Sequence, residues 1–250
     1  MAGHSKWSTI KRKKAAVDAK RGKVFTKILR EVTIAARIGG GDPDGNPRLR
    51  SAIQEARTNN VPSDNIERAV KKGTGELEGA VYEEVTYEGY GPSGVAMLVE
   101  VATDNRNRTV GEVRHQFSKH GGNLGENGCV SYLFDQRGYF AIDPGTLDEE
   151  AFMELALDLG ADDIATDKGP YEIFAAVGDY SAIRDQLEAK GIAPDVAQLA
   201  MIPQTTVELD ADSLSKVMRL VEGLEDLDDV QNVWANFEAD DALLDAYEAG

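Results

Sequence analysis

The hydrophobic pattern of the chain changes near residue 75, and this change most constrains its fold. Before that point, apolar residues recur about every 3.6 residues, as on the buried face of a helix. After it, residues 82–87 and 95–101 form β-branched and aromatic runs that are typical of strands. A length of 250 residues also exceeds the usual size of one domain. The sequence therefore predicts an α+β protein of three domains, beginning with a small helical bundle.

Three helices are expected in the first 75 residues. The first covers about residues 10–38 and ends at a glycine-rich run. The second has Asn46 as its N-cap and stops before Pro62, because proline disfavours the helical conformation of the preceding residue. Ser63 is the candidate cap of the third helix, and Gly73 lies just past its predicted end.

The remaining residues are expected to form two α/β domains. A predicted helix at residues 109–119 and a strand at 130–134 follow the first two strands. From Tyr139 the predicted order is strand, helix, strand, strand, helix, strand, which is the ferredoxin-like arrangement. The strand, helix and strand over residues 205–237 are assigned to the unit before it. The predicted domains are therefore residues 1–75, residues 76–136 plus 204–250, and an inserted ferredoxin-like domain at residues 137–203.

Charge is divided sharply along the chain. The whole sequence has a net charge of −17, yet residues 1–75 hold 17 basic and 7 acidic residues, a net charge of +10. The other 175 residues hold 10 basic and 37 acidic residues, a net charge of −27. Such polarity indicates one end that attracts a polyanion and another that repels it.

The basic residues near the N-terminus are the main candidate site. Between Lys6 and Arg30 there are ten bases and one acid, Asp18. Each lysine or arginine that neutralises a phosphate releases counterions, which drives binding to nucleic acid. A merely solvated helix face is the alternative, although such faces usually mix both signs. Two further residues, His4 and Trp7, would either stack on an exposed base or anchor the arm to the bundle. The predicted nucleic-acid-binding residues are His4, Lys6, Trp7, Lys11, Arg12, Lys13, Lys14, Lys20, Arg21, Lys23, Lys27 and Arg30.

A second candidate anion site lies between a predicted strand and the start of a helix. Its residues are Asn105, Arg106, Asn107 and Arg108. Unpaired N–H groups at a helix N-terminus favour an anion, and two arginines would hold it as a fork. Equally, these residues would cap the helix while the arginines pair with acids of the chain. Both interpretations stay open.

No catalytic, metal or cofactor site is predicted. Residues 89–94 have the glycine spacing of a dinucleotide site, but a strand follows them where the mechanism requires a helix. His115 and His120 are five residues apart, about 140° around a helix, which disfavours a shared metal. The sequence therefore predicts a protein that is not an enzyme and needs no cofactor. For the acidic runs at 222–229 and 238–248, solvated termini are favoured over mimicry of phosphate.

A cytoplasmic location is expected from three features. No run approaches the roughly 20 apolar residues of a membrane-spanning helix. The start lacks the apolar core of a secretory signal. The single cysteine, Cys129, cannot form an intramolecular disulfide, as is typical of a reducing compartment.

Several motifs together resemble the YebC/PmpR family. They are MAGHSKW (residues 1–7), KRGK (20–23), GGGDP (39–43), NPRL (46–49), YEGYGP (87–92), TDNRNRT (103–109) and GGNL (121–124). The resemblance implies a cytoplasmic protein of one helical and two α/β domains. Members are described as DNA-binding transcriptional regulators, while relatives in mitochondria are translational activators of cytochrome oxidase and bacterial members are linked to ribosomes stalled on proline-rich stretches.

Two functions follow as hypotheses from the resemblance and the charge. The first is a DNA-binding regulator of transcription. The alternative is a ribosome-associated translation factor that binds ribosomal or transfer RNA and relieves stalling on proline-rich stretches. Both place nucleic acid against the basic N-terminal domain, and neither requires a membrane or a small-molecule substrate. The DNA or RNA target and the oligomeric state stay open.

Overall fold

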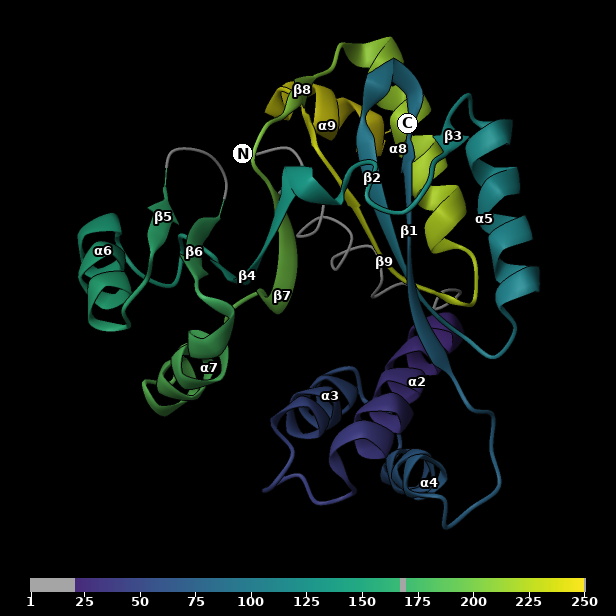
Figure 1. Ribbon diagram of the computed structural model, residues 1–250. Helices are drawn as coiled ribbons and strands as arrows, with labels where there is room; N and C mark the ends of the chain where they lie inside the picture. Colours follow the sequence, from purple (N-terminus) through teal and green to yellow (C-terminus); the bar gives the residue numbers. More distant parts are fainter. Residues whose placement is uncertain (1–20, 167–169, 250) are drawn as a thin grey trace.

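The computed structural model describes residues 21–166 and 170–249 and consists of three units (Figure 1). Helices α2, α3 and α4 form the helical unit. A central unit combines a sheet with α5, α8 and α9, and a second sheet with α6 and α7 forms the ferredoxin-like unit. The α+β architecture predicted from the sequence is confirmed. Residues 10–20 of the first predicted helix lie outside the described residues.

In the helical unit, α2 packs against both other helices. The helices are α2 (Arg21–Gly39), α3 (Pro47–Thr58) and α4 (Ser63–Thr74). Their buried core includes Val32, Leu49 and Ile66. Asn46 is confirmed as the N-cap of α3: its side-chain oxygen accepts from the Leu49 N–H at 3.1 Å. The Asn46 amide also donates to the Ala35 carbonyl at 2.8 Å, so one side chain both starts α3 and fixes it to α2.

Two expectations for α4 are wrong. Ser63 is the first residue of the helix rather than its cap, because Pro62 occupies the cap position and no side chain caps there. Gly73 lies inside α4, which ends at Thr74 before Gly75 with its φ of 84°. A Cβ at position 73 would overlap the Thr33 carbonyl oxygen of α2. Gly73 therefore permits close helix packing and does not end the helix.

The central unit contains a four-stranded sheet of order β3-β1-β2-β9, in which every neighbouring pair is antiparallel. The predicted hairpin connection between β1 and β2 is confirmed, because a short 3₁₀ turn, Pro92–Gly94, joins them. The elements are β1 (Glu83–Tyr90), β2 (Ala96–Thr103), α5 (Arg106–Lys119), β3 (Asn123–Leu124), β8 (Val207–Glu208), α8 (Ala211–Glu225), β9 (Val230–Ala235), β10 (Phe237–Glu238) and α9 (Asp241–Ala249). Strands β8 and β10 form a separate parallel pair. The chain thus returns to the first sheet through β9, after the ferredoxin-like unit.

The ferredoxin-like unit has strand order β5-β6-β4-β7, again with antiparallel neighbours. Its elements are β4 (Phe134–Ile142), α6 (Glu149–Asp158), β5 (Asp163–Ala165), β6 (Tyr171–Ala175), α7 (Tyr180–Ala189) and β7 (Val196–Pro203). The predicted β-α-β-β-α-β order is confirmed.

The predicted strand at residues 130–134 is wrong. Ser131–Leu133 form a 3₁₀ turn, and a single strand, β4, begins at Phe134. The buried carboxylate of Glu88 accepts hydrogen bonds from the backbone N–H groups of Gly128, Val130 and Ser131, at 2.7–2.9 Å. Because these N–H groups bond a side chain from β1, they do not join a strand ladder.

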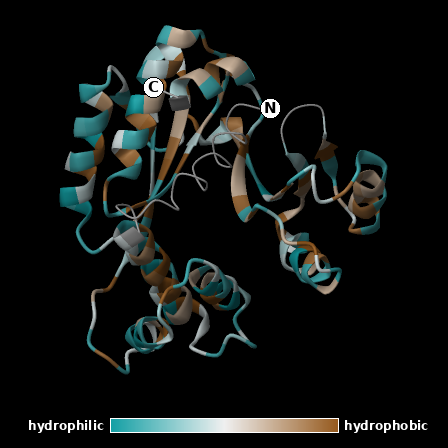
Figure 2. Ribbon diagram, turned by 180° about the vertical axis from the view of Figure 1, so that it is seen from behind, coloured by the Kyte–Doolittle hydropathy of each residue, from teal (hydrophilic) through white to brown (hydrophobic). Residues whose placement is uncertain are grey.

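The central sheet is covered on both faces. Helices α5 and α8 pack on one face, where Val99 and Phe117 belong to one buried cluster with residues of α8. On the other face, Leu98 and Trp234 share a buried cluster with Phe134 and other residues of the ferredoxin-like sheet. Figure 2 shows that the outward side of α5 is mainly hydrophilic. The central and ferredoxin-like units are therefore joined by an apolar contact.

Candidate nucleic-acid interface

Only part of the predicted basic site falls in the described part of the chain. His4, Lys6, Trp7, Lys11, Arg12, Lys13, Lys14 and Lys20 lie outside the described residues. Arg21 begins α2. Lys23, Lys27 and Arg30 lie on α2 at a spacing of four and three residues, which puts them on one side of the helix.

Lys23 and Lys27 contact the end of α8. The Lys23 ammonium lies 3.0 Å from the Asp226 carbonyl oxygen and 3.4 Å from its carboxylate. The Lys27 ammonium donates to the Glu225 carbonyl at 2.7 Å. The last carbonyls of a helix lack partners within it and carry the negative end of its dipole. Cations from α2 therefore satisfy the C-terminal end of α8.

Arg30 is almost closed off from solvent between the helical and central units. It donates to the Asp228 carbonyl at 2.7 Å and the Ala102 carbonyl at 2.9 Å. Its guanidinium also lies 3.1 Å from the Asp229 carboxylate, with side chains 9% and 5% exposed respectively. In this arrangement Lys23, Lys27 and Arg30 face an acidic segment of the chain itself.

The Asp229 carboxylate also lies at the start of α5, where the sequence predicts the second anion site. It accepts from Thr109 at 2.6 Å, Thr103 at 3.0 Å and Arg108 at 2.6 Å. Burial alone would raise the pKa of Asp229, but these hydrogen bonds and the charge of Arg30 lower it below its ordinary value. The start of α5 thus has a carboxylate from this chain beside it.

The four residues of that site divide into two pairs. Asn105 caps α5 by accepting from the Arg108 N–H at 3.2 Å. The Arg108 guanidinium lies between Asp104, at 2.9 Å, and Asp229. Capping and arginine pairing therefore describe the geometry of Asn105 and Arg108, whereas Arg106 and Asn107 are exposed.

Another arginine links the helical unit to β1. Arg48 contacts Glu31 at 2.7 Å and Glu84 at 2.6 Å. The hydrogen bonds to these two carboxylates outweigh burial and raise the pKa of Arg48. This cation is therefore engaged within the chain.

Four basic residues not singled out by sequence reasoning lie on the outer side of the helical unit. Arg57 is near the end of α3, and Arg68, Lys71 and Lys72 belong to α4. All four are exposed, and none forms an ion pair with a described residue. Arg57 and Lys71 border an open groove of about 690 Å³. For Arg57, Lys71 and Lys72, the position in the last turn of a helix was a usable signal, since cations favour helix C-termini.

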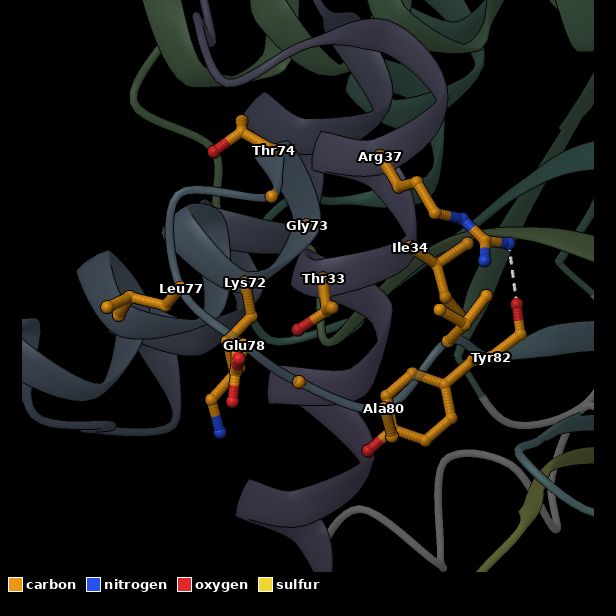
Figure 3. A pocket seen from close by; sticks show the side chains of 13 residues that line it. Thr33, Ile34, Arg37, Lys72, Gly73, Thr74, Leu77, Glu78, Ala80 and Tyr82 are labelled. Atoms are coloured by element: carbon orange, nitrogen blue, oxygen red, sulfur yellow. Dashed lines mark hydrogen bonds between the residues drawn. The ribbon is translucent and has the colours of Figure 1, made fainter.

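A smaller pocket, of about 360 Å³, lies where the linker after α4 passes α2 (Figure 3). Arg37 extends from α2 and donates to the Tyr82 carbonyl. Lys72 and Gly73 line the pocket from α4, and Glu78 lines it from the linker. Its titratable side chains offer contacts to an anion but do not include a pair of carboxylates.

The described residues contain no group of three or more metal-ligating side chains that could hold an ion. None of their helices is long and apolar enough to span a membrane.

Known proteins resemble this chain along its length. Residues 5–76 match a family profile described as "TACO1/YebC protein N-terminal domain", and residues 82–237 match "TACO1/YebC second and third domain". A "Probable transcriptional regulatory protein" of Syntrophus aciditrophicus is 56% identical over 250 residues, which is 100% of both chains. A protein of the same description from Persephonella marina is 56% identical over 247 residues, covering 98% of this chain and 99% of that one. The crystal structure of a conserved hypothetical protein from Aquifex aeolicus is similar, with 49% identity, a TM-score of 0.84, and coverage of 91% of this chain and 94% of that chain.

Proposed function

Because this chain belongs to the TACO1/YebC family, we propose that it is a non-enzymatic regulator of gene expression that binds nucleic acid through its helical N-terminal domain. The observation that carries the proposal is the division of charge, +10 in residues 1–75 against −27 in the rest. A phosphate backbone is attracted to the first part and repelled by the bulk of the second. The charge division therefore supports binding of the polyanion at the N-terminal end.

Not every cation of the helical N-terminal domain is available to phosphate. Lys27 and Arg30 are held by the end of α8 and by Asp229. We assign phosphate contacts instead to the bases of residues 6–21 and to the exposed cations Arg57, Arg68, Lys71 and Lys72 of α3 and α4. These groups meet solvent or come from the part of the sequence richest in bases.

A DNA-binding regulator of transcription is the first candidate, because relatives over 50% identical are named "Probable transcriptional regulatory protein". A specific regulator must discriminate its site, typically by about 10³-fold or more over other DNA.

A ribosome-associated translation factor is the second candidate, and the charge of α4 favours it. A recognition helix reads bases with its N-terminal residues. In α4, Asp64 lies in the first turn, and Lys71 and Lys72 lie in the last. This distribution suits contacts to backbone phosphates better than base readout. Structured RNA is recognised largely through its shape and backbone.

One binding experiment separates the candidates. Fluorescence anisotropy of the full chain would compare a promoter duplex, a shuffled duplex and an RNA hairpin between about 50 and 200 mM salt. Preference for the promoter supports regulation of transcription, and preference for the hairpin supports translation. Crosslinking in cells, followed by sequencing of the attached nucleic acid, checks the result in vivo. Absence of binding to every probe would contradict both candidates.

Reversing two N-terminal charges tests the site itself. The variant Lys13→Glu/Lys14→Glu should bind more weakly, with a log–log salt slope shallower by about 1.8, because two phosphate contacts are lost at about 0.9 each. The control Arg137→Glu/Lys190→Glu makes the same charge change on the ferredoxin-like unit and should bind like the wild type. Equal losses in both variants would reduce the effect to overall charge and remove residues 13 and 14 from the site.

A further inference from the structure

The outer surface of α5 and α8 is basic although it belongs to the acidic part of the chain. Residues 76–250 contain 10 basic residues, and six of them lie on these two helices. The same helices carry only four of the 37 acidic residues. Since α5 and α8 pack next to each other on one face of the central sheet, the six cations are gathered in a single layer.

Two of the six cations already have acidic partners. Arg108 pairs with Asp104 and Asp229, and Lys216 pairs with Asp212 at 2.6 Å. The other four are exposed and form no ion pair with any described residue. We call them the α5/α8 cations: Arg106, Arg114, Lys119 and Arg219.

The acids of this layer do little to neutralise them. Asp212 is taken by Lys216. Near the end of α8, the Glu222 side chain hydrogen-bonds Tyr247, and the Asp226 carboxylate lies 3.4 Å from the Lys23 ammonium. Glu112 is the one exposed acid on α5. An uncompensated cluster of like charges is unfavourable by itself and gains free energy when an anion binds.

Two of the four cations, Lys119 and Arg219, lie where the C-terminal part of α5 meets α8. Burial lowers the pKa of His120, and the nearby charges of Lys119, Arg219 and His115 lower it further. The helices are in tight contact here, because a Cβ at Gly223 of α8 would lie 2.7 Å from the Gln116 side-chain oxygen of α5. Packing of α5 against α8 therefore fixes the backbone positions of Lys119 and Arg219 relative to each other.

We propose that the α5/α8 cations form a second contact surface for the phosphate backbone of duplex or structured nucleic acid. The inference rests on the proposed function and extends it from the helical unit to the central unit.

The size and position of the surface suit such a ligand. With 14 residues, α5 is about 21 Å long, roughly six steps along a duplex. Arg106 and Lys119 stand at its two ends. At the Arg106 end, the Asp229 network joins α5 to α2. Lys23, two residues after the start of α2, contacts the end of α8. The described chain thus begins at the border of this layer.

The test compares two double charge reversals in the full chain. Lys119→Glu/Arg219→Glu changes the cluster, while Arg137→Glu/Lys190→Glu makes the same charge change on the ferredoxin-like unit. Both are titrated against a fluorescein-labelled RNA duplex and the matching DNA duplex, and circular dichroism confirms the fold. We expect the first variant to bind about tenfold more weakly or worse, with a salt slope shallower by about 1.8, and the control to match the wild type. Loss on one duplex only would identify RNA or DNA as the ligand.

The two proposals fail in different ways. In one outcome, the wild type binds both duplexes, Lys13→Glu/Lys14→Glu weakens binding, and Lys119→Glu/Arg219→Glu leaves it unchanged. This outcome excludes the α5/α8 surface as a contact for nucleic acid and leaves the proposed function in place. If wild type binds neither duplex, both proposals fall. A misfolded Lys119→Glu/Arg219→Glu variant is replaced by Lys119→Gln/Arg219→Gln, for which the expected slope change is also about 1.8 because the same two contacts are lost.

Discussion

Single residues decide how the helical and central units meet. Asp229 is 3% exposed and receives two hydroxyls and two arginines, Arg30 from α2 and Arg108 from α5. Lys23 makes a more exposed contact to the same region, with 48% of its side chain in solvent. A buried charge pair left without one partner is costly, whereas an exposed pair contributes little.

We therefore expect Arg30→Met and Lys23→Met to differ. Arg30→Met should lower the free energy of unfolding by about 1.5–3 kcal/mol, the range for hydrogen bonds to charged groups. Lys23→Met should cost less than about 1 kcal/mol. Urea denaturation followed by circular dichroism measures both. Equal effects would mean that Asp229 does not depend on Arg30.

The same carboxylate predicts a dependence of stability on pH. The pKa of Asp229 is lowered in the folded protein, so its contribution is complete above the unfolded value of about 4 and is lost as pH falls through the folded pKa. Glu88, whose pKa is also lowered, acts in the same direction. Thermal melts from neutral to strongly acidic pH should show a steep loss below about pH 4. Asp229→Asn should flatten this loss, and an unchanged profile would contradict the assignment.

At the scale of elements, Gly73 and Gly22 are glycines within helices in opposite surroundings. A Cβ at Gly73 would overlap α2, whereas a Cβ at Gly22 would meet nothing within 4 Å. Gly73→Ala should lower the free energy of unfolding by about 1–3 kcal/mol through overpacking. Gly22→Ala should raise it by up to about 1 kcal/mol, because alanine favours the helix. Thermal denaturation of both variants gives the two signs, and stabilisation by Gly73→Ala would refute the close packing of α4 on α2.

Local signals predicted the elements, and distant contacts explain the errors. Asn46 is predictable as a cap from Pro47 beside it, and its partner in the structure, Leu49, is only three residues away. The error at Gly73 arose because a helix stop and a close packing contact use the same residue. At residues 130–134 the pattern resembled a strand, but Glu88, about 40 positions earlier, binds the backbone there. Local periodicity does not predict contacts between residues so far apart in the sequence.

Across the whole molecule, the two kinds of interface differ in chemistry. The helical unit meets the central unit through charged and polar groups such as Arg30 and Arg48. The central and ferredoxin-like units share an apolar cluster that contains Leu98 and Trp234. The division of charge was visible in the sequence. That Lys27 faces α8 was not, because its partner lies 198 residues away.

This difference predicts which units lose protection together. Trp234→Ala should cost about 3–5 kcal/mol, as for other buried aromatic residues. Hydrogen exchange should then accelerate in both β2 and β4, while the protection of α3 stays as in the wild type. Val217→Ala, on the opposite face of the central sheet, is the control and should leave β4 unaffected. Faster exchange in α3 for Trp234→Ala would indicate a single cooperative unit.

The pairing of β9 with β2 also sets an order of events during synthesis. Strand β2 is complete at Thr103, but the neighbour that it needs ends at Ala235. A nascent chain has then already released the whole inserted unit, which is able to close first. Until β9 arrives, β2 exposes an unpaired edge, the kind of surface that aggregates. Synthesis of the central unit thus begins before that of the ferredoxin-like unit and ends after it. During that interval, chaperones would have the exposed edge of β2 to protect.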